Sequence, residues 1–124
     1  MPIAPEFIVN FVERTRDLVT EIEPSYFELN VAMAFLAFAE EKVDIAVIEA
    51  GMGGRLDSTN ILLPELCLIT NIGYDHMEFL GNDLASIAAE KAGIIKKNTP
   101  VVIGKTQPET QAVFEKKSGE MEAP

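Results

Sequence analysis

Apolar residues recur at helical spacing in two long segments near the amino terminus. In residues 5–22 they fall on one side, with charged side chains on the other, which is typical of an amphipathic helix. Residues 26–42 are apolar on nearly every side, as in a helix that packs between layers or against a partner. Ser25 and Glu28 form a capping-box pattern at the start of this helix. From the residues alone, capping is the favoured role of both.

Three short apolar runs follow the pattern of buried strands. They are Ile45–Ile48, Leu66–Ile72 and Pro100–Gly104. Each is short, bounded by polar or turn-forming residues and rich in β-branched or other apolar side chains, which indicates burial on both faces of a parallel sheet. We therefore expect three strands among the helices.

The order of the elements predicts an α/β fold, with a mostly parallel sheet covered by helices on both faces. A last helix is expected from a capping box of Thr106 and Glu109 to about Lys116. Residues 118–124 show no periodicity and are expected to fray. No linker, repeat or low-complexity segment interrupts residues 1–124, so the sequence predicts one domain or a piece of one.

Composition narrows the class of protein. The 124 residues include 20 acidic and 10 basic side chains, a net charge of −10, which argues against binding to nucleic acid. The single cysteine, Cys67, lies in an apolar run and is expected to be buried and inert. With no disulfide framework, no membrane-spanning apolar stretch and no signal-peptide pattern, the sequence predicts a soluble cytoplasmic protein.

The segment Val43–Asn60 has the strongest features of a site. Glu49 directly follows the run Ile45–Ile48 and precedes a glycine-rich stretch, GMGG. Ligands in open α/β sheets bind beyond the carboxyl ends of strands, and glycines permit close approach of the backbone. Glu49 is therefore either a hydrogen-bonded strand-end residue or a cation ligand. Leu56 replaces the third glycine of a dinucleotide fingerprint, and the sequence contains no G-x-x-x-x-G-K-[ST] phosphate loop.

The only histidine, His76, lies beside Asp75 just beyond the predicted strand 66–72. The carboxyl ends of parallel strands share one edge of a sheet, so His76 is expected at the same edge as Glu49. Lone histidines are usually surface residues or satisfied core residues. Because of its expected position beside Glu49, a structural role and a metal-ligand role are equally open for His76.

Residues 84–95 predict a helix capped by Asn82 or Asp83. Helical spacing continued from Leu84 places Lys91 on the inward side. A buried ammonium is costly unless it is paired or neutralised. The alternative is a side chain whose stem packs while its charge reaches water.

The sequence resembles the folylpolyglutamate synthase/dihydrofolate synthase family, a branch of the Mur ligases. The resemblance extends from about Ile3 to Glu115 and is carried by three blocks. They are PSYFE at 24–28, VIEAGMGGRLDSTN at 47–60, and residues 69–95, which contain IGYDH and EKAGII. It implies that Glu49 and His76 bind Mg²⁺ with a serine from the phosphate loop, and that a carbamylated Lys91 helps to hold a second Mg²⁺. It also implies a pterin-binding surface formed by Ser25, Tyr26, Phe27, Glu28, Leu56, Asp57 and Ser58.

The reaction implied by the resemblance consumes ATP. A folate or dihydropteroate carboxylate is phosphorylated to an acyl phosphate, and the amine of L-glutamate then displaces phosphate to form an amide. Metal ions suit this chemistry because they neutralise charge on the transferred phosphoryl group. Glu49 provides the hard oxygen ligand that Mg²⁺ prefers, and the His76 imidazole would also suit Mn²⁺.

The family's phosphate loop and carboxy-terminal domain have no counterpart in these residues. The sequence is therefore expected to be an internal fragment of the central ATPase domain, inactive alone and able to self-associate through uncovered apolar surface. The alternatives are a catalytically silent binding or assembly module, another Mur-type amino-acid ligase such as a muramyl-peptide ligase, and, more remotely, a dinucleotide-dependent oxidoreductase. The sequence leaves open whether the ligase adds the first glutamate, later ones or both.

Overall fold

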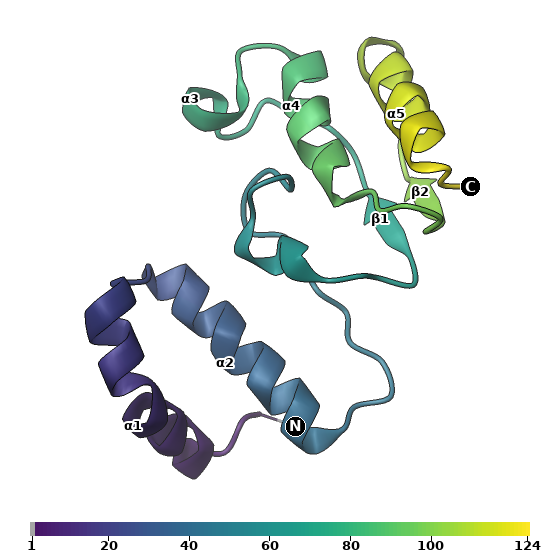
Figure 1. Ribbon diagram of the computed structural model, residues 1–124. Helices are drawn as coiled ribbons and strands as arrows, with labels where there is room; N and C mark the ends of the chain where they lie inside the picture. Colours follow the sequence, from purple (N-terminus) through teal and green to yellow (C-terminus); the bar gives the residue numbers. More distant parts are fainter. Residues whose placement is uncertain (1) are drawn as a thin grey trace. The chain divides into compact units, whose positions relative to one another are not determined.

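The computed structural model describes residues 2–124, which form two compact units (Figure 1). One unit ends at Ile48 and the other runs from Glu49 to Pro124. No helix of the described residues is both long enough and apolar enough to cross a membrane.

The first unit is a pair of packed helices, α1 (Pro5–Ile22) and α2 (Tyr26–Glu41). The bounds of both helices agree closely with those expected from the apolar periodicity. Pro5 starts α1, where the missing N–H of proline costs no helical hydrogen bond. The predicted capping box of α2 is confirmed: the Ser25 amide donates to Glu28 Oε2 at 2.7 Å, and the Glu28 amide donates to Ser25 Oγ at 3.2 Å.

The predicted strand at Ile45–Ile48 is wrong for this structure. The segment has no strand pairing, and the side chains of Ile45 and Val47 are 84% and 92% exposed. The β-propensity of an apolar run depends on packing against neighbouring strands and helices. Within residues 2–124 no strand pairs with this run, so its pattern does not produce a strand.

The second unit contains a parallel sheet of β1 (Cys67–Ile69) and β2 (Val101–Ile103). Leu68 pairs with Val102, which confirms two of the three expected strands and their parallel direction. The remaining elements are η1 (Ser58–Ile61), α3 (Met77–Leu80), α4 (Leu84–Lys91), η2 (Ala92–Ile94) and α5 (Pro108–Met121).

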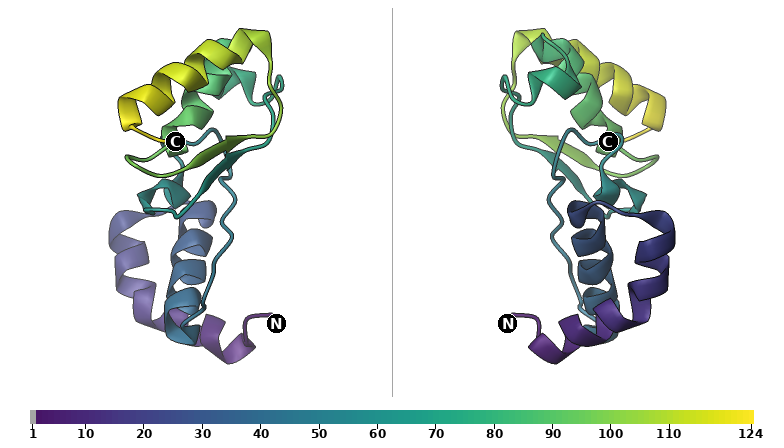
Figure 2. Two further views of the ribbon diagram at one scale, coloured as in Figure 1. Left: turned by 90° about the vertical axis from the view of Figure 1, so that its right-hand side faces the viewer. Right: turned by 90° about the vertical axis from the view of Figure 1, so that its left-hand side faces the viewer.

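Helices α4 and α5 pack together and lie on one side of the sheet (Figure 2). Cys67 and Ile69 point to that side and are 3% and 4% exposed, whereas Leu68 and Val102 are about half exposed on the other. The core consists of Ile69, Ile72, Leu80, Ile87, Ala88, Ala92, Ile95 and Phe114. Full burial of a side chain such as Ile87 stabilises the fold by about 1.5–3 kcal/mol.

The start of α5 differs from the prediction. Its N-cap is Gln107 without a side-chain capping bond, so the Thr106–Glu109 capping box is wrong. The Gln107 side chain instead pairs with the backbone of Ile72: Oε1 accepts from the Ile72 amide at 2.9 Å, and Nε2 donates to the Ile72 carbonyl at 3.0 Å. The N-cap side chain thus makes a tertiary contact, while Pro108 occupies the first turn of the helix.

The expectation that residues 118–124 fray is also wrong. Helix α5 continues to Met121, whose carbonyl accepts from the Asn98 amide at 2.9 Å. The Pro124 carbonyl accepts from the Val101 amide at 2.9 Å, and Ala123 packs against the core. Contacts with β2 and the core hold a segment that has no apolar periodicity of its own.

Candidate functional site

The glycine-rich loop after Glu49 is closed by Asp57. Its Oδ2 accepts from the amides of Gly51 and Met52, each at 2.9 Å. Its Oδ1 accepts from the Thr59 amide at 2.9 Å and the Thr59 hydroxyl at 2.6 Å. Burial opposes the charged form, but these hydrogen bonds outweigh it and hold the pKa of Asp57 below its ordinary value. Four intramolecular donors thus occupy the carboxylate.

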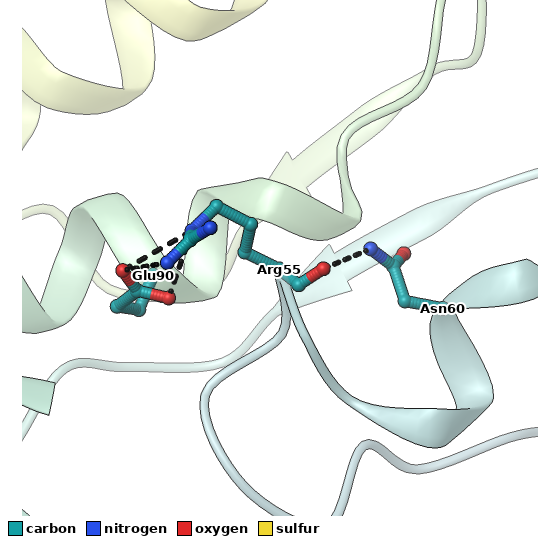
Figure 3. A network of polar contacts seen from close by, with 3 residues as sticks. All are labelled: Arg55, Asn60 and Glu90. Atoms are coloured by element: carbon teal, nitrogen blue, oxygen red, sulfur yellow. Dashed lines mark hydrogen bonds and ion pairs between the residues drawn. The ribbon is translucent and has the colours of Figure 1, made fainter. Parts of the chain in front are cut away.

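The same loop is joined to the end of α4 by Arg55 and Glu90 (Figure 3). Arg55 Nη2 donates to Glu90 Oε1 at 3.0 Å, while Nε lies 3.2 and 3.1 Å from the two carboxylate oxygens. The Arg55 amide also donates to the Glu90 carbonyl at 2.9 Å. This combination fixes both the side chain and the backbone of Arg55 against the helix.

Two glycines, Gly54 in the loop and Gly93 just after α4, allow these segments to approach closely. A Cβ at Gly54 would lie 2.8 Å from Ile94 Cγ2 and 2.9 Å from the Lys91 carbonyl oxygen. Asn60 Nδ2 donates to the Arg55 carbonyl at 3.1 Å (Figure 3). It also donates to the Gly93 carbonyl at 3.1 Å, so Asn60 joins the loop to the segment after α4. The predicted helix 84–95 accordingly ends at Lys91 and continues as the short 3₁₀ turn η2.

The proposed metal ligands Glu49, His76 and Lys91 lie on three different segments of this unit: the loop start, α3 and α4. Glu49 is exposed at the start of the loop. His76 is the N-cap of α3, with a left-handed φ of 49°, and its side chain is 47% exposed. Its Nε2 lies 3.6 Å from Asp75 Oδ2, a contact that is ionic only when the imidazole is protonated.

Lys91 is the last residue of α4 and is half-buried, as its predicted inward position implies. It takes part in none of the ion pairs formed by residues 2–124. Across the same residues, no three histidine, cysteine, aspartate or glutamate side chains form a metal-holding cluster. Mg²⁺ sites often use only one or two protein carboxylates with phosphates and water, so the donor chemistry of Glu49 fits that ion.

The candidate pterin-binding residues fall in both units. Ser25 and Glu28 cap each other, and the hydrogen bonds from Ser25 lower the pKa of Glu28. Tyr26 is 83% exposed. In the second unit Leu56 is exposed, and Ser58 begins η1 beside Asp57. Capping is therefore confirmed for Ser25 and Glu28, and a role in substrate binding stays a prediction.

Sequence reasoning gave no role to Arg55, Asn60, Glu90 or Gly93, although all four lie in the blocks that carry the resemblance. Arg55 and Glu90 are 35 positions apart, and neither helical nor strand periodicity connects them. The only local signal is Gly93, because a glycine after a helix often marks a turn or a close backbone contact.

Comparisons with known proteins identify relatives. The family model for the Mur ligase middle domain matches residues 12–121. The dihydrofolate synthase/folylpolyglutamate synthase of Bacillus subtilis (strain 168) is 50% identical over 103 residues, or 82% of this chain and 24% of that protein. A solved folylpolyglutamate synthase complex with AMPPCP and folate matches with a TM-score of 0.93 at 35% identity, over 100% of this chain and 32% of that one.

Folylpolyglutamate synthase of Mycobacterium tuberculosis, solved with ADP and AMPPCP, matches with a TM-score of 0.85 at 41% identity. That match covers 98% of this chain and 30% of the solved one. The chain thus spans about a quarter of the length of the Bacillus relative and about a third of the folate complex.

Proposed function

This chain belongs to the Mur ligase family, and we propose that it forms part of an ATP-dependent ligase that joins a folate or dihydropteroate carboxylate to L-glutamate. The observation that carries the proposal is the contact of the glycine-rich loop after Glu49 with the end of α4, where Lys91 lies. This contact brings the backbone of the loop after Glu49 next to the backbone around Lys91. His76, the third candidate residue, lies outside it. One solved relative is a complex with AMPPCP and folate, which supports the same substrate classes here.

The proposed reaction has two steps. An oxygen of the substrate carboxylate attacks the γ-phosphorus of ATP, and the bond to the β–γ bridging oxygen breaks, so ADP leaves with the electron pair. The glutamate amine then attacks the acyl carbon, phosphate leaves with the C–O electrons, and the amine releases a proton to solvent. Both steps depend mainly on alignment of the reacting groups.

Glu49 and His76 are proposed to hold Mg²⁺, or Mn²⁺, with ligands from outside this chain. The ion, when bound, supplies positive charge that stabilises the transferred phosphoryl group. The exposed Glu49 carboxylate is available for such a role, and the left-handed backbone at His76 places its side chain at the start of α3.

Lys91 is proposed to react with carbon dioxide. Its neutral amine forms an N–C bond to the carbon, electrons move to one oxygen, and the nitrogen loses a proton, which leaves a carbamate anion. Its half-buried position and lack of an ion pair within residues 2–124 are compatible with this modification. The carbamate would provide an anionic oxygen for a second metal ion.

Ser25–Glu28 in the first unit and Leu56–Ser58 in the second are each proposed to contact the substrate. The exposed ring of Tyr26 offers an apolar face that suits a flat pterin ring. Asp57 is different, because its carboxylate is already occupied by four donors of its own loop. Its contribution to substrate binding is therefore to shape the segment that carries Leu56 and Ser58.

We place this activity in cytoplasmic one-carbon metabolism, where folates carry glutamate chains. The test uses the complete ligase that contains this chain and measures ADP release and glutamate incorporation. We expect both to require ATP, a metal ion, a folate or dihydropteroate, and glutamate. ATP hydrolysis that does not depend on the folate and glutamate, without amide formation, would contradict the proposal.

A further inference from the structure

We propose that the ion pair between Arg55 and Glu90 positions Lys91 relative to the loop that follows Glu49, so that both residues act as positioning residues for the metal site. This inference rests on the proposed function. It assigns to the pair a role in catalysis beyond its contribution to folding.

The first argument is the number of hydrogen bonds that Arg55 makes with Glu90. The Arg55 guanidinium reaches both oxygens of Glu90, and the Arg55 amide donates to the carbonyl of the same residue at 2.9 Å. That carbonyl lies in the last turn of α4, where the amide of the C-cap residue Ala92 also points to it. Arg55 therefore restrains the turn that ends at Lys91 through its backbone and its side chain.

The second argument is continuity along the chain. Asp57 holds the amides of Gly51 and Met52, which follow Glu49 within three positions. Arg55 lies in the same closed loop, and Glu90 is bonded directly to Lys91 in the backbone. A short series of hydrogen bonds and peptide bonds thus connects the two proposed metal-binding segments.

The third argument is the solvent exposure of the two paired side chains. The side chains of Arg55 and Glu90 are 56% and 27% exposed, and ion pairs near the surface contribute little to stability. A bidentate guanidinium–carboxylate pair does impose a defined geometry. Loss of the pair should therefore change the placement of Lys91 more than the stability of the unit.

The test compares Arg55→Met, Glu90→Gln and the double variant in the complete ligase. Lys97→Met is the matched control, because Lys97 forms an exposed 3.5 Å pair with Glu122 in the same unit. The measurements are kcat, KM for the folate, the Mg²⁺ concentration for half-maximal rate, and the unfolding midpoint. After labelling with ¹³C-bicarbonate, NMR also measures the Lys91 carbamate.

We expect each single variant to lower kcat on the order of 10-fold, as loss of outer partners of metal ligands commonly does. The Mg²⁺ requirement should rise and the carbamate signal should fall, with unfolding midpoints matching the control. The double variant should be no worse than either single variant, because both remove the same contact.

Unchanged carbamate signal and Mg²⁺ requirement in both single variants would overturn the inference. So would a raised KM for the folate in Arg55→Met alone, which would make Arg55 a substrate contact. A wild-type ligase without folate- and glutamate-dependent turnover would refute the proposed function itself, and the inference would fall with it. The wild-type assay thus distinguishes failure of the proposed ligase function from failure of the positioning role alone.

Discussion

Gly93 passes the backbone of Arg55 so closely that a Cβ added to Gly93 would clash with the Arg55 Cα and lie 2.7 Å from the Arg55 backbone nitrogen. No side chain rotation can relieve this contact, because the opposing atoms belong to the backbone and Cβ of Arg55. The end of α4 and the glycine-rich loop can meet only if residue 93 has no side chain.

Gly93→Ala is therefore expected to destabilise the second unit by about 1–3 kcal/mol, as overpacking of a tight contact does. Gly119→Ala is the matched control, since a Cβ there meets no atom within 4 Å and α5 favours alanine over glycine. Denaturant unfolding should show a lower midpoint for the first variant and an equal or higher one for the second. Equal midpoints for Gly93→Ala and wild type would show that the loop can move away.

Asp57→Asn should weaken the closed loop by about 1 kcal/mol or more, because the amide nitrogen would face backbone donors. The pKa of Asp57 is lowered in the folded protein, so its stabilising contribution is present above the ordinary aspartate pKa. That contribution is lost as the pH falls below about 4 toward the folded pKa. Unfolding measured from pH 6 downward should show a shallower acid dependence in the variant, and identical acid dependence would contradict this.

In the complete ligase, Glu49→Gln should keep the fold and lower turnover by at least about 100-fold, because it removes the charge of a proposed metal ligand. His76→Ala should reduce turnover less, since water can take a coordination position of Mg²⁺. Steady-state rates across a range of Mg²⁺ concentrations, with circular dichroism as the folding control, make the comparison. Near-wild-type rates for both variants would restrict these residues to structural roles.

Lys91→Arg should abolish most of the activity while the fold is retained. A guanidinium stays protonated and cannot form a carbamate, although its charge and length resemble those of lysine. Lys91→Ala should also lose activity, and added acetate should restore part of it by supplying the missing carboxylate. An arginine variant that keeps most of the wild-type rate at saturating ATP and Mg²⁺ would show that the modified-lysine role is wrong.

The isolated chain should self-associate. Ile45 and Val47 are 84% and 92% exposed in a segment without strand pairing, and exposed apolar segments promote association with other chains. Val47→Lys should raise the proportion of monomer in light scattering across a range of concentrations. Leu63→Lys, at a position that is 89% exposed outside this segment, is the control. A wild-type chain that stays monomeric at every concentration would refute the expectation.

The sequence by itself determined the elements whose signals are local. The periodicity of residues 5–22 and the Ser25–Glu28 box fixed α1 and the start of α2, because capping bonds join residues only three positions apart. Asp83 likewise caps α4 through the Ser86 amide at 2.8 Å. The family blocks also located the candidate site residues along the chain.

Tertiary structure decided the features that depend on distant partners. The run Ile45–Ile48 has the composition of a strand, yet a strand also needs neighbouring backbone to pair with. Gln107, the N-cap of α5, pairs through its side chain with the backbone of Ile72, 35 positions away. Arg55 and Glu90 meet across the same separation, and only the folded backbone brings two such surface charges into contact.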